Sequence, residues 1–337
     1  MKNCVHFGRF RRITEHPDSF KMAEAYSLSF HTVEGVQNTE TQMETGYQLQ
    51  RTIMIVSIPI CTLGLLGNAV VLWLLWCFIP KTNLTVYFLN KAVADLAVLI
   101  YYITVFILFL KEVPISLFGL HIMELAHGFG FNASTYILTA ICAERFLMVF
   151  SPACYKLNRH KHFSEIMCGL LWSLSCLVSV TLYFACYLQL DPLLTEVNSI
   201  CVPTKTARAI VNLLVFLPIM ILSAFFLLVR MLNKPQGSAP EKIDITIVAI
   251  VLLFLLFAAS VRIVDIAVHW IPQIHISVVF LIFHFLDAID SSGNPFIYFW
   301  VGYTKNQVDS GRSIQMFLQR AFLDDENRTR NASSARR

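Results

Sequence analysis

The sequence predicts an all-α membrane protein, in which a bundle of seven transmembrane helices is followed by an amphipathic eighth helix. The 337 residues are 56% hydrophobic and only 14% charged, and their mean hydropathy is +0.61. So few charges cannot cover the surface of a water-soluble protein of this size. Apolar stretches long enough to cross a hydrocarbon core of about 30 Å as helices recur seven times along the chain.

The seven expected spans differ in the charge that they carry. Three contain no charged residue, namely 53–78, 166–190 and 209–229. Four contain a few ionisable residues each, namely 86–110, 121–150, 245–270 and 276–301. A helix satisfies all of its backbone polar groups within one span, and none of the stretches shows the alternating period of a barrel strand. Helices are therefore expected throughout.

The loops between the spans predict the orientation, because Lys and Arg accumulate in short cytoplasmic loops. The connections after the first, third and fifth spans carry seven basic residues: Lys81, Lys156, Arg159, Lys161, Arg230, Lys234 and Lys242. The connections after the second, fourth and sixth spans carry three: Lys111, Lys205 and Arg208. The N-terminus is therefore expected outside the cell and the C-terminus inside.

The remaining segments complete the predicted organisation. Residues 1–50 are polar and are expected to form an extracellular disordered tail before the transmembrane domain at 51–303. All five basic residues of this tail precede Met22, so translation from Met22 is an alternative to translation from Met1. Residues 304–322 are expected to form the eighth helix, with a cytoplasmic tail at 323–337. The apolar residues of the expected eighth helix recur at helical spacing: Ile314, Phe317, Leu318 and Phe322. An unstructured segment is the alternative.

Charged side chains within the spans mark candidate functional sites, because a membrane does not tolerate such groups without a partner or a cavity. Three pairs occur: Lys91 with Asp95, Arg262 with Asp265, and Asp287 with Asp290. The members of the first two pairs lie within one helical turn of each other. Mutual neutralisation of Arg262 and Asp265, with no further role, is as good an interpretation as a binding site.

The order of several short motifs resembles that of the rhodopsin-like G-protein-coupled receptors. They are Gly67-Asn68, Ala94-Asp95-Leu96, Glu144-Arg145-Phe146, Trp172, Pro218 and Asn294-Pro295-Phe296-Ile297-Tyr298. Within that superfamily, the stretches YILTAICAE (136–144), LLWSLSCLV (170–178) and NPFIYFWVG (294–302) resemble Mas-related receptors. The resemblance implies a plasma-membrane receptor, not an enzyme, that binds an extracellular ligand and activates heterotrimeric G proteins.

The resemblance also implies roles for individual residues. Glu144, Arg145 and Tyr298 occupy the positions of the G-protein switch, in which Arg145 is held by Glu144 until activation. Mas-related receptors link helix four to the start of helix five by a disulfide, and Cys186 and Cys201 occupy those places.

The expected ligand pocket lies in the outer halves of the third, sixth and seventh helices. Its candidate residues form an amphoteric lining: His127, Arg262, Asp265, His269, His284 and Asp287. Such a lining suits a peptide or a small amphipathic molecule. Relatives that bind strongly basic ligands carry acids at the positions of Leu182 and Lys205, so a weak response to polycations is expected here.

A sodium ion is the only non-protein group that the resemblance implies. Many rhodopsin-like receptors hold sodium at the positions of Asp95, Ser134, Ser291 and Asn294. This sequence adds Asp290 and Lys91. Three arrangements are open: a cation between the two acids, a retained proton, or Lys91 as an internal counter-ion to both acids. A fourth arrangement gives the lysine no role at the site: Lys91 points to cytoplasmic water, and Asp290 is protonated or faces a polar neighbour.

Departures from the family pattern leave a second function open. Ser260 replaces the usual proline of helix six, and Phe226 replaces a tyrosine of helix five. A non-signalling or constitutively active seven-helix protein is therefore the alternative, and a transporter is less favoured because the chain shows no internal repeat. Light sensing is excluded because Ala288 stands where opsins have the retinal lysine. Nucleic-acid binding is not expected, since 27 Phe outnumber the 26 Lys and Arg.

Overall fold

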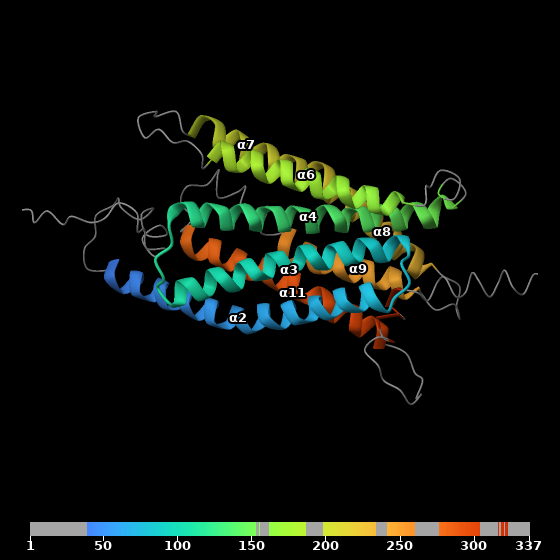
Figure 1. Ribbon diagram of the computed structural model, residues 1–337, viewed down its shortest axis with the longest axis horizontal. Coiled ribbons are helices and arrows are strands. Elements are labelled where there is room, and N and C mark those ends of the chain that lie inside the picture. Colours follow the sequence, from blue (N-terminus) through green and yellow to red (C-terminus); the bar gives the residue numbers. More distant parts are fainter. Residues whose placement is uncertain are drawn as a thin grey trace, which may run out of the picture.

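The computed structural model describes residues 39–152, 155, 162–186, 198–233, 241–259 and 276–303, together with 316, 318, 319, 321 and 322. Within this part of the chain every regular element is a helix. The helices run along the long axis of the molecule, with α2, α3 and α4 side by side and with α6 and α7 along one outer edge (Figure 1).

Seven helical spans make up the bundle in the described residues. They are α2 (Thr39–Cys77), α3 (Asn83–Leu110), α4 (Leu117–Phe150), α6 (Phe163–Cys186), the continuous α7 (Asn198–Val211), η2 (Asn212–Phe216) and α8 (Leu217–Leu232), then α9 (Lys242–Phe254) with η3 (Leu255–Ala259), and α11 (Ile276–Tyr303). The first six are long and apolar enough to cross a membrane. Because α11 packs against α2, α3 and α9 as the seventh, the predicted seven-helix bundle is confirmed.

Two helix starts are fixed by side-chain caps. At α3, Thr82 accepts a hydrogen bond from the backbone N–H of Thr85, and the Thr85 hydroxyl accepts one from the backbone N–H of Thr82. At α4, the Ser116 hydroxyl accepts from the N–H of Gly119. These caps satisfy backbone donors that have no partner inside the helix, which explains why the helices begin there.

The N-terminal boundary differs from the sequence prediction. Helix α2 begins at Thr39, so residues 39–50, which were expected to belong to the disordered tail, are helical. Most of these residues are good helix formers, and they extend a helix that the following apolar span already nucleates. The ring of Tyr47 also lies 6.4 Å from that of Phe109 in α3. At other boundaries, residues 187–190 and 260–270 of the expected spans lie outside the described residues.

The fifth span, formed by α7, η2 and α8, changes its helical winding before its proline. The π-helical segment η2 directly precedes α8, and Pro218 lies in the first turn of α8. Proline has no N–H to donate and its ring crowds the carbonyl one turn earlier. A π-helical turn accommodates this defect without ending the helix. A second π-helical segment, η3, occurs in helix six immediately before Ser260.

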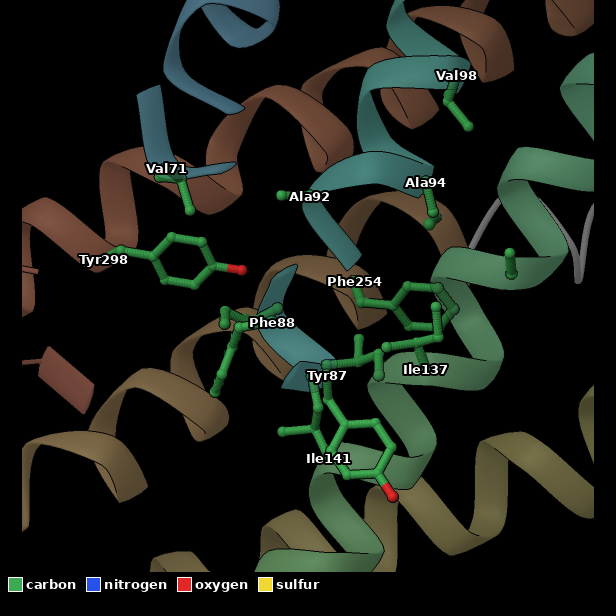
Figure 2. Close-up of a cluster of buried hydrophobic side chains, with 14 of the residues drawn as sticks. Val71, Tyr87, Phe88, Ala92, Ala94, Val98, Ile137, Ile141, Phe254 and Tyr298 are labelled. Carbon is green, nitrogen blue, oxygen red and sulfur yellow. The ribbon is translucent and has the colours of Figure 1, made fainter. Parts of the chain in front are cut away.

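The core of the bundle is built around α3. Figure 2 shows Phe88 from α3, Ile137 and Ile141 from α4, Phe254 from α9 and Tyr298 from α11 converging on one cluster. Lipid is as apolar as these side chains, so close van der Waals packing rather than exclusion of water holds the helices together. A Cβ on Gly67 would lie 3.0 Å from the Pro295 ring, so glycine permits the close contact of α2 with α11.

The described residues after α11 confirm the amphipathic eighth helix. Residues 316, 318, 319, 321 and 322 are helical. Leu318, Ala321 and Phe322 are buried, whereas Met316 is exposed. The Phe322 ring lies 4.5 Å from Phe88. Two of the apolar residues predicted for this helix, Leu318 and Phe322, therefore face the bundle.

Candidate functional site

Three polar clusters lie within the apolar bundle. The lysine cluster is Lys91, Asp95, Ser134 and Asn294. Lys91 and Asp95 are 1% and 0% exposed, and the Lys91 ammonium lies 3.2 Å from each Asp95 carboxylate oxygen. Residues four apart on a helix share a face, which explains why α3 brings these two charges together. Lys91 and Asp95 therefore form a buried ion pair within one helix.

Two further helices complete the lysine cluster. Lys91 Nζ donates to Ser134 Oγ of α4 at 2.8 Å, and Ser134 Oγ donates to Asp95 Oδ1 at 2.7 Å. Asn294 Nδ2 of α11 donates to Asp95 Oδ2 at 2.8 Å. An ammonium group has three protons, and Asp95 and Ser134 supply an acceptor for each of them. The cluster thus connects α3, α4 and α11 at the centre of the bundle.

The other two residues expected at this site have different contacts. The carbonyl oxygen of Ser291 accepts a hydrogen bond from Asn68 Nδ2 of α2 at 3.0 Å. Asp290 is buried, and its Oδ1 has no hydrogen-bond partner within the described chain. Among the described ion pairs, Lys91 binds Asp95 and not Asp290. The hydrogen bonds of Lys91 thus go to Asp95 and Ser134, and neutralisation of both acids by the lysine stays a prediction.

The arginine cluster, Arg145, Arg230, Glu241 and Asp244, lies at one end of the bundle. Arg145 of α4 donates through Nε to Asp244 Oδ1 at 2.6 Å and through a terminal nitrogen to Glu241. Arg230 of α8 donates to the same two acids, at 3.3 Å to Asp244 and 3.1 Å to Glu241. Two cations and two anions thus join α4, α8 and the start of α9.

Burial makes the arginine cluster energetically important. Arg145 is 2% exposed and Asp244 is fully buried. Removing one member of such a pair strands the other charge, which typically costs about 3–5 kcal/mol. Beside the cluster, Lys242 Nζ donates to the Gly302 carbonyl at 3.2 Å and connects α9 to the end of α11. The packing of α9 therefore depends on charges at its first turn.

Sequence reasoning selected Arg145 but missed its partners on α9. Glu144 Oε1 accepts a hydrogen bond from Tyr155 at 2.8 Å, and the expected hold of Glu144 on Arg145 stays a prediction. One signal in the sequence could have found these acids. Both belong to the run Glu-Lys-Ile-Asp (241–244), which directly precedes the apolar part of helix six. Tyr298 is buried, and its ring lies 5.6 Å from Phe88 (Figure 2).

The histidine cluster lies at the opposite end of the bundle and comprises Tyr101, Tyr102, His127, His284 and Asp287. The Tyr102 hydroxyl lies 2.9 Å from His127 Nε2 and donates to Asp287 Oδ2 at 3.2 Å. Tyr101 stacks on His127 with ring centroids 4.5 Å apart, and the two histidine rings are 5.8 Å apart.

The histidine cluster brings together three of the six residues expected in the ligand pocket, His127, His284 and Asp287. The other three, Arg262, Asp265 and His269, lie outside the described residues. Sequence reasoning missed Tyr101 and Tyr102. For Tyr102 a signal was available, because it lies seven residues beyond Asp95 and residues seven apart lie on nearly the same face of a helix.

A disulfide joins Cys186 at the end of α6 to Cys201 in the first turn of α7, with their Cα atoms 4.7 Å apart. This confirms the pairing that the family resemblance implied. The bond lies at the end of the bundle where α4 begins, which is also the end that carries His127.

Comparisons with known proteins place this architecture in a family. Residues 67–298 match the family model described as 7 transmembrane receptor (rhodopsin family). The chain is 33% identical to the proto-oncogene Mas of Rattus norvegicus over 282 residues, which cover 80% of this chain and 83% of that protein. It is 30% identical to the human Mas-related G-protein coupled receptor member X1 over 287 residues, 84% of this chain and 87% of that receptor.

A third relative extends the match further. The Mas-related G-protein coupled receptor member H of Mus musculus is 31% identical over 313 residues, which cover 89% of this chain and 94% of that receptor. These relatives are signalling receptors and not enzymes, and they are multi-pass membrane proteins. Given the seven-helix bundle, the matched motifs and the disulfide, the chain belongs to the Mas-related group of the rhodopsin family of seven-transmembrane receptors.

Proposed function

We propose that this receptor lies in the plasma membrane with its N-terminus outside, binds an extracellular ligand and activates heterotrimeric G proteins. The observation that carries the proposal is the arginine cluster. Arg145 of α4 forms buried ion pairs with Glu241 and Asp244 at the start of α9. Releasing Arg145 would require the start of α9 to move away from α4. The cytoplasmic end of the bundle is, in this proposal, the end with the arginine cluster.

The arginine cluster provides a two-state latch. In the described arrangement, Glu241 and Asp244 hold Arg145 and Arg230 together, so α9 is drawn against α4 and α8. Moving the start of α9 outward separates the acids from Arg145 and leaves a guanidinium that needs a new polar partner. A G protein that supplies this partner stabilises the open state and thereby shifts the population towards it.

The histidine cluster is the proposed ligand site. His127, His284 and Asp287, with the two tyrosines, offer hydrogen-bond donors, acceptors and stacking surfaces at this end of the bundle. Arg262, Asp265 and His269 would add charge of both signs. This chemistry favours a peptide or a small amphipathic molecule, and it does not favour a polycation because Lys205 occupies a position that an acid would need to fill.

For the lysine cluster, we propose that the Lys91 ammonium acts in place of a sodium ion. The ammonium already neutralises Asp95 and occupies the acceptors that a cation would use, at 3.2 Å, 3.2 Å and 2.8 Å. A sodium ion would have to displace a covalently tethered charge. The receptor therefore needs no bound ion at Asp95, and Asp290 is not part of the pair.

One observation favours a second candidate, a receptor that binds its ligand without signalling. Phe226 of α8, at the position of a switch tyrosine, has no hydroxyl and packs against the rings of Phe146 and Phe150 at 5.4 Å and 5.8 Å. An apolar contact of this kind cannot hydrogen-bond a released Arg145.

Agonist-independent signalling distinguishes the two candidates without a known ligand. The wild type and Arg145→Ala are expressed in cells that carry biosensors for each class of Gα subunit, and activity is divided by surface expression. The receptor proposal expects wild-type activity above that of Arg145→Ala with at least one Gα class. Equal activity of the two proteins in every class, at equal surface levels, would favour the non-signalling candidate.

A further inference from the structure

The histidine cluster contains a hydrogen-bonded relay that joins three helices. The Tyr102 hydroxyl of α3 has one hydrogen, which it donates to Asp287 Oδ2 of α11 at 3.2 Å. The bond of 2.9 Å between Tyr102 and His127 of α4 must then be donated by the histidine, through a hydrogen on Nε2. The relay therefore runs from an imidazole, through one hydroxyl, to a carboxylate.

This direction of donation makes Nδ1 the nitrogen of His127 that takes up a proton. A neutral imidazole carries a hydrogen on one nitrogen, and an imidazolium carries one on each. With a proton from water on Nδ1, the Nε2–H group becomes a charge-assisted donor to Tyr102, and the hydroxyl becomes a stronger donor to Asp287. The relay therefore stays intact and becomes stronger when His127 is charged.

The surroundings of His127 suit a cation that is reached from water. The Tyr101 ring stacks on the His127 ring with centroids 4.5 Å apart and planes 25° apart, and an aromatic face attracts a positive charge. Asp287 is 3% exposed, so solvent screens its charge little. His127 itself is only partly buried. Of the relay, the imidazole is thus the group that water reaches.

His284 limits the cluster to one proton. Its ring lies one turn before Asp287 on α11, with its centroid 5.8 Å from that of His127. Two imidazolium charges at this distance repel each other, so binding of one proton opposes binding of a second. His127 is the histidine whose ring nitrogen enters the relay, so we assign the proton to it.

The other charges near His127 are mostly acids. On α4, Glu124 lies three residues before His127 and near the same face, and on α11 Asp290 lies one turn beyond Asp287. On α3 the nearest charges, Lys91 and Asp95, form an ion pair. The described parts of α6, α8 and α9, which also pack against α4, carry charges only at the end with the arginine cluster: Glu165, Arg230, Lys242 and Asp244. Three further charged or titratable residues of helix six lie outside the described residues: Arg262, Asp265 and His269.

We propose that His127 is a proton-binding site through which acid outside the cell stabilises the described arrangement of the bundle. A bound proton strengthens the bonds that join α3, α4 and α11, so this stabilisation is present at low pH and is lost as the pH rises and His127 becomes neutral. The inference rests on the proposed function, in which this end of the bundle faces outward and the described arrangement is the one with the latch closed. Extracellular acid should therefore lower signalling.

The Tm of the full-length receptor in phosphatidylcholine nanodiscs tests the proton site without a ligand or a G protein. The wild type is compared with Tyr102→Phe, which removes only the hydroxyl, and with His127→Gln. The measurements are made at about pH 7.5 and about pH 5.5, the range in which an imidazole ordinarily gains its proton. The Tm of the wild type minus that of each variant should be larger by about 2–4 °C at the lower pH.

His284→Gln is the matched control, because it removes the neighbouring imidazole and leaves the relay in place. Its Tm difference from the wild type should not grow as the pH falls. The proposal is overturned if the Tm difference for Tyr102→Phe or for His127→Gln is the same at both pH values, or if the difference for His284→Gln grows as much as theirs.

Agonist-independent signalling at the same two extracellular pH values separates the proton site from the proposed function. Biosensor activity is corrected for cells without the receptor and divided by surface expression. It should fall at least about threefold at about pH 5.5 in the wild type and stay constant in Tyr102→Phe. If the Tm differences grow as expected while acid leaves signalling unchanged, the proton site is supported and the proposed link between this arrangement and G-protein activation fails.

Discussion

Arg145 of α4 and Asp244 of α9 lie 99 residues apart in the chain, yet a hydrogen bond of 2.6 Å joins them at a site where the aspartate is fully buried. Arg230 binds the second oxygen of the same carboxylate at 3.3 Å. One aspartate thus holds two arginines from two helices. The position of the start of α9 therefore determines whether Arg145 is available to another partner.

The lysine cluster predicts a specific pattern of rescue. Lys91→Leu leaves the Asp95 carboxylate buried without its cation, and we expect a loss of about 3–5 kcal/mol in stability. Lys91→Leu combined with Asp95→Asn removes both charges and should restore most of the surface expression and thermal stability. The control is Lys91→Leu with Asp290→Asn, which should not restore them, because Asp290 is not the ion-pair partner of Lys91. Equal rescue by both double variants would contradict the assignment.

The same cluster predicts indifference to sodium. The Tm of the purified receptor should be the same in sodium chloride and in choline chloride of equal ionic strength, because Lys91 already provides the cation at Asp95. Ser134→Ala should not change this result. A rise in Tm that requires sodium and disappears in Asp95→Asn would show that an ion binds in addition to the lysine.

The disulfide predicts non-additive losses. Cys186→Ser and Cys201→Ser should each reduce stability by about 3 kcal/mol, the amount expected for a closed loop of about 15 residues. The double variant should be no worse than either single variant, because all three lack the same bond. Surface expression and Tm measure the effect, with Cys176→Ser, an exposed free cysteine of α6, as the control. Losses that add would mean that the two cysteines act independently.

Much of the architecture follows from local sequence. Each apolar span is long enough to form its own helix, and Lys91 with Asp95 can be paired from spacing alone because residues four apart share a face. Helix α2 is an exception at its start. The polar residues 39–50 carry no apolar period of their own, and their helix depends on the span that follows them.

The partner of Arg145 could not be predicted in the same way. Glu144 is its neighbour in the sequence, but sequence adjacency gives no information about acids on another helix. Asp244 becomes a neighbour only when α9 packs beside α4. For the same reason Tyr101 and Tyr102 were missed, since their contact with His127 depends on the packing of α3 against α4.

The most direct test of the latch is the basal activity of Asp244→Asn, which keeps the shape of the side chain and removes its charge. A hydrogen bond to a charged group contributes about 1.5–3 kcal/mol, so the population of the open state should rise about tenfold or more. The control is Glu165→Gln, which changes an exposed acid of α6 that binds His162.

Agonist-independent G-protein activation, divided by surface expression measured through an N-terminal epitope, is the quantity to compare. The account predicts a clear rise in Asp244→Asn, no rise in Glu165→Gln, and loss of the gain when Arg145→Ala is added to Asp244→Asn. Unchanged activity in Asp244→Asn at wild-type surface levels, or a gain that survives the removal of Arg145, would contradict it.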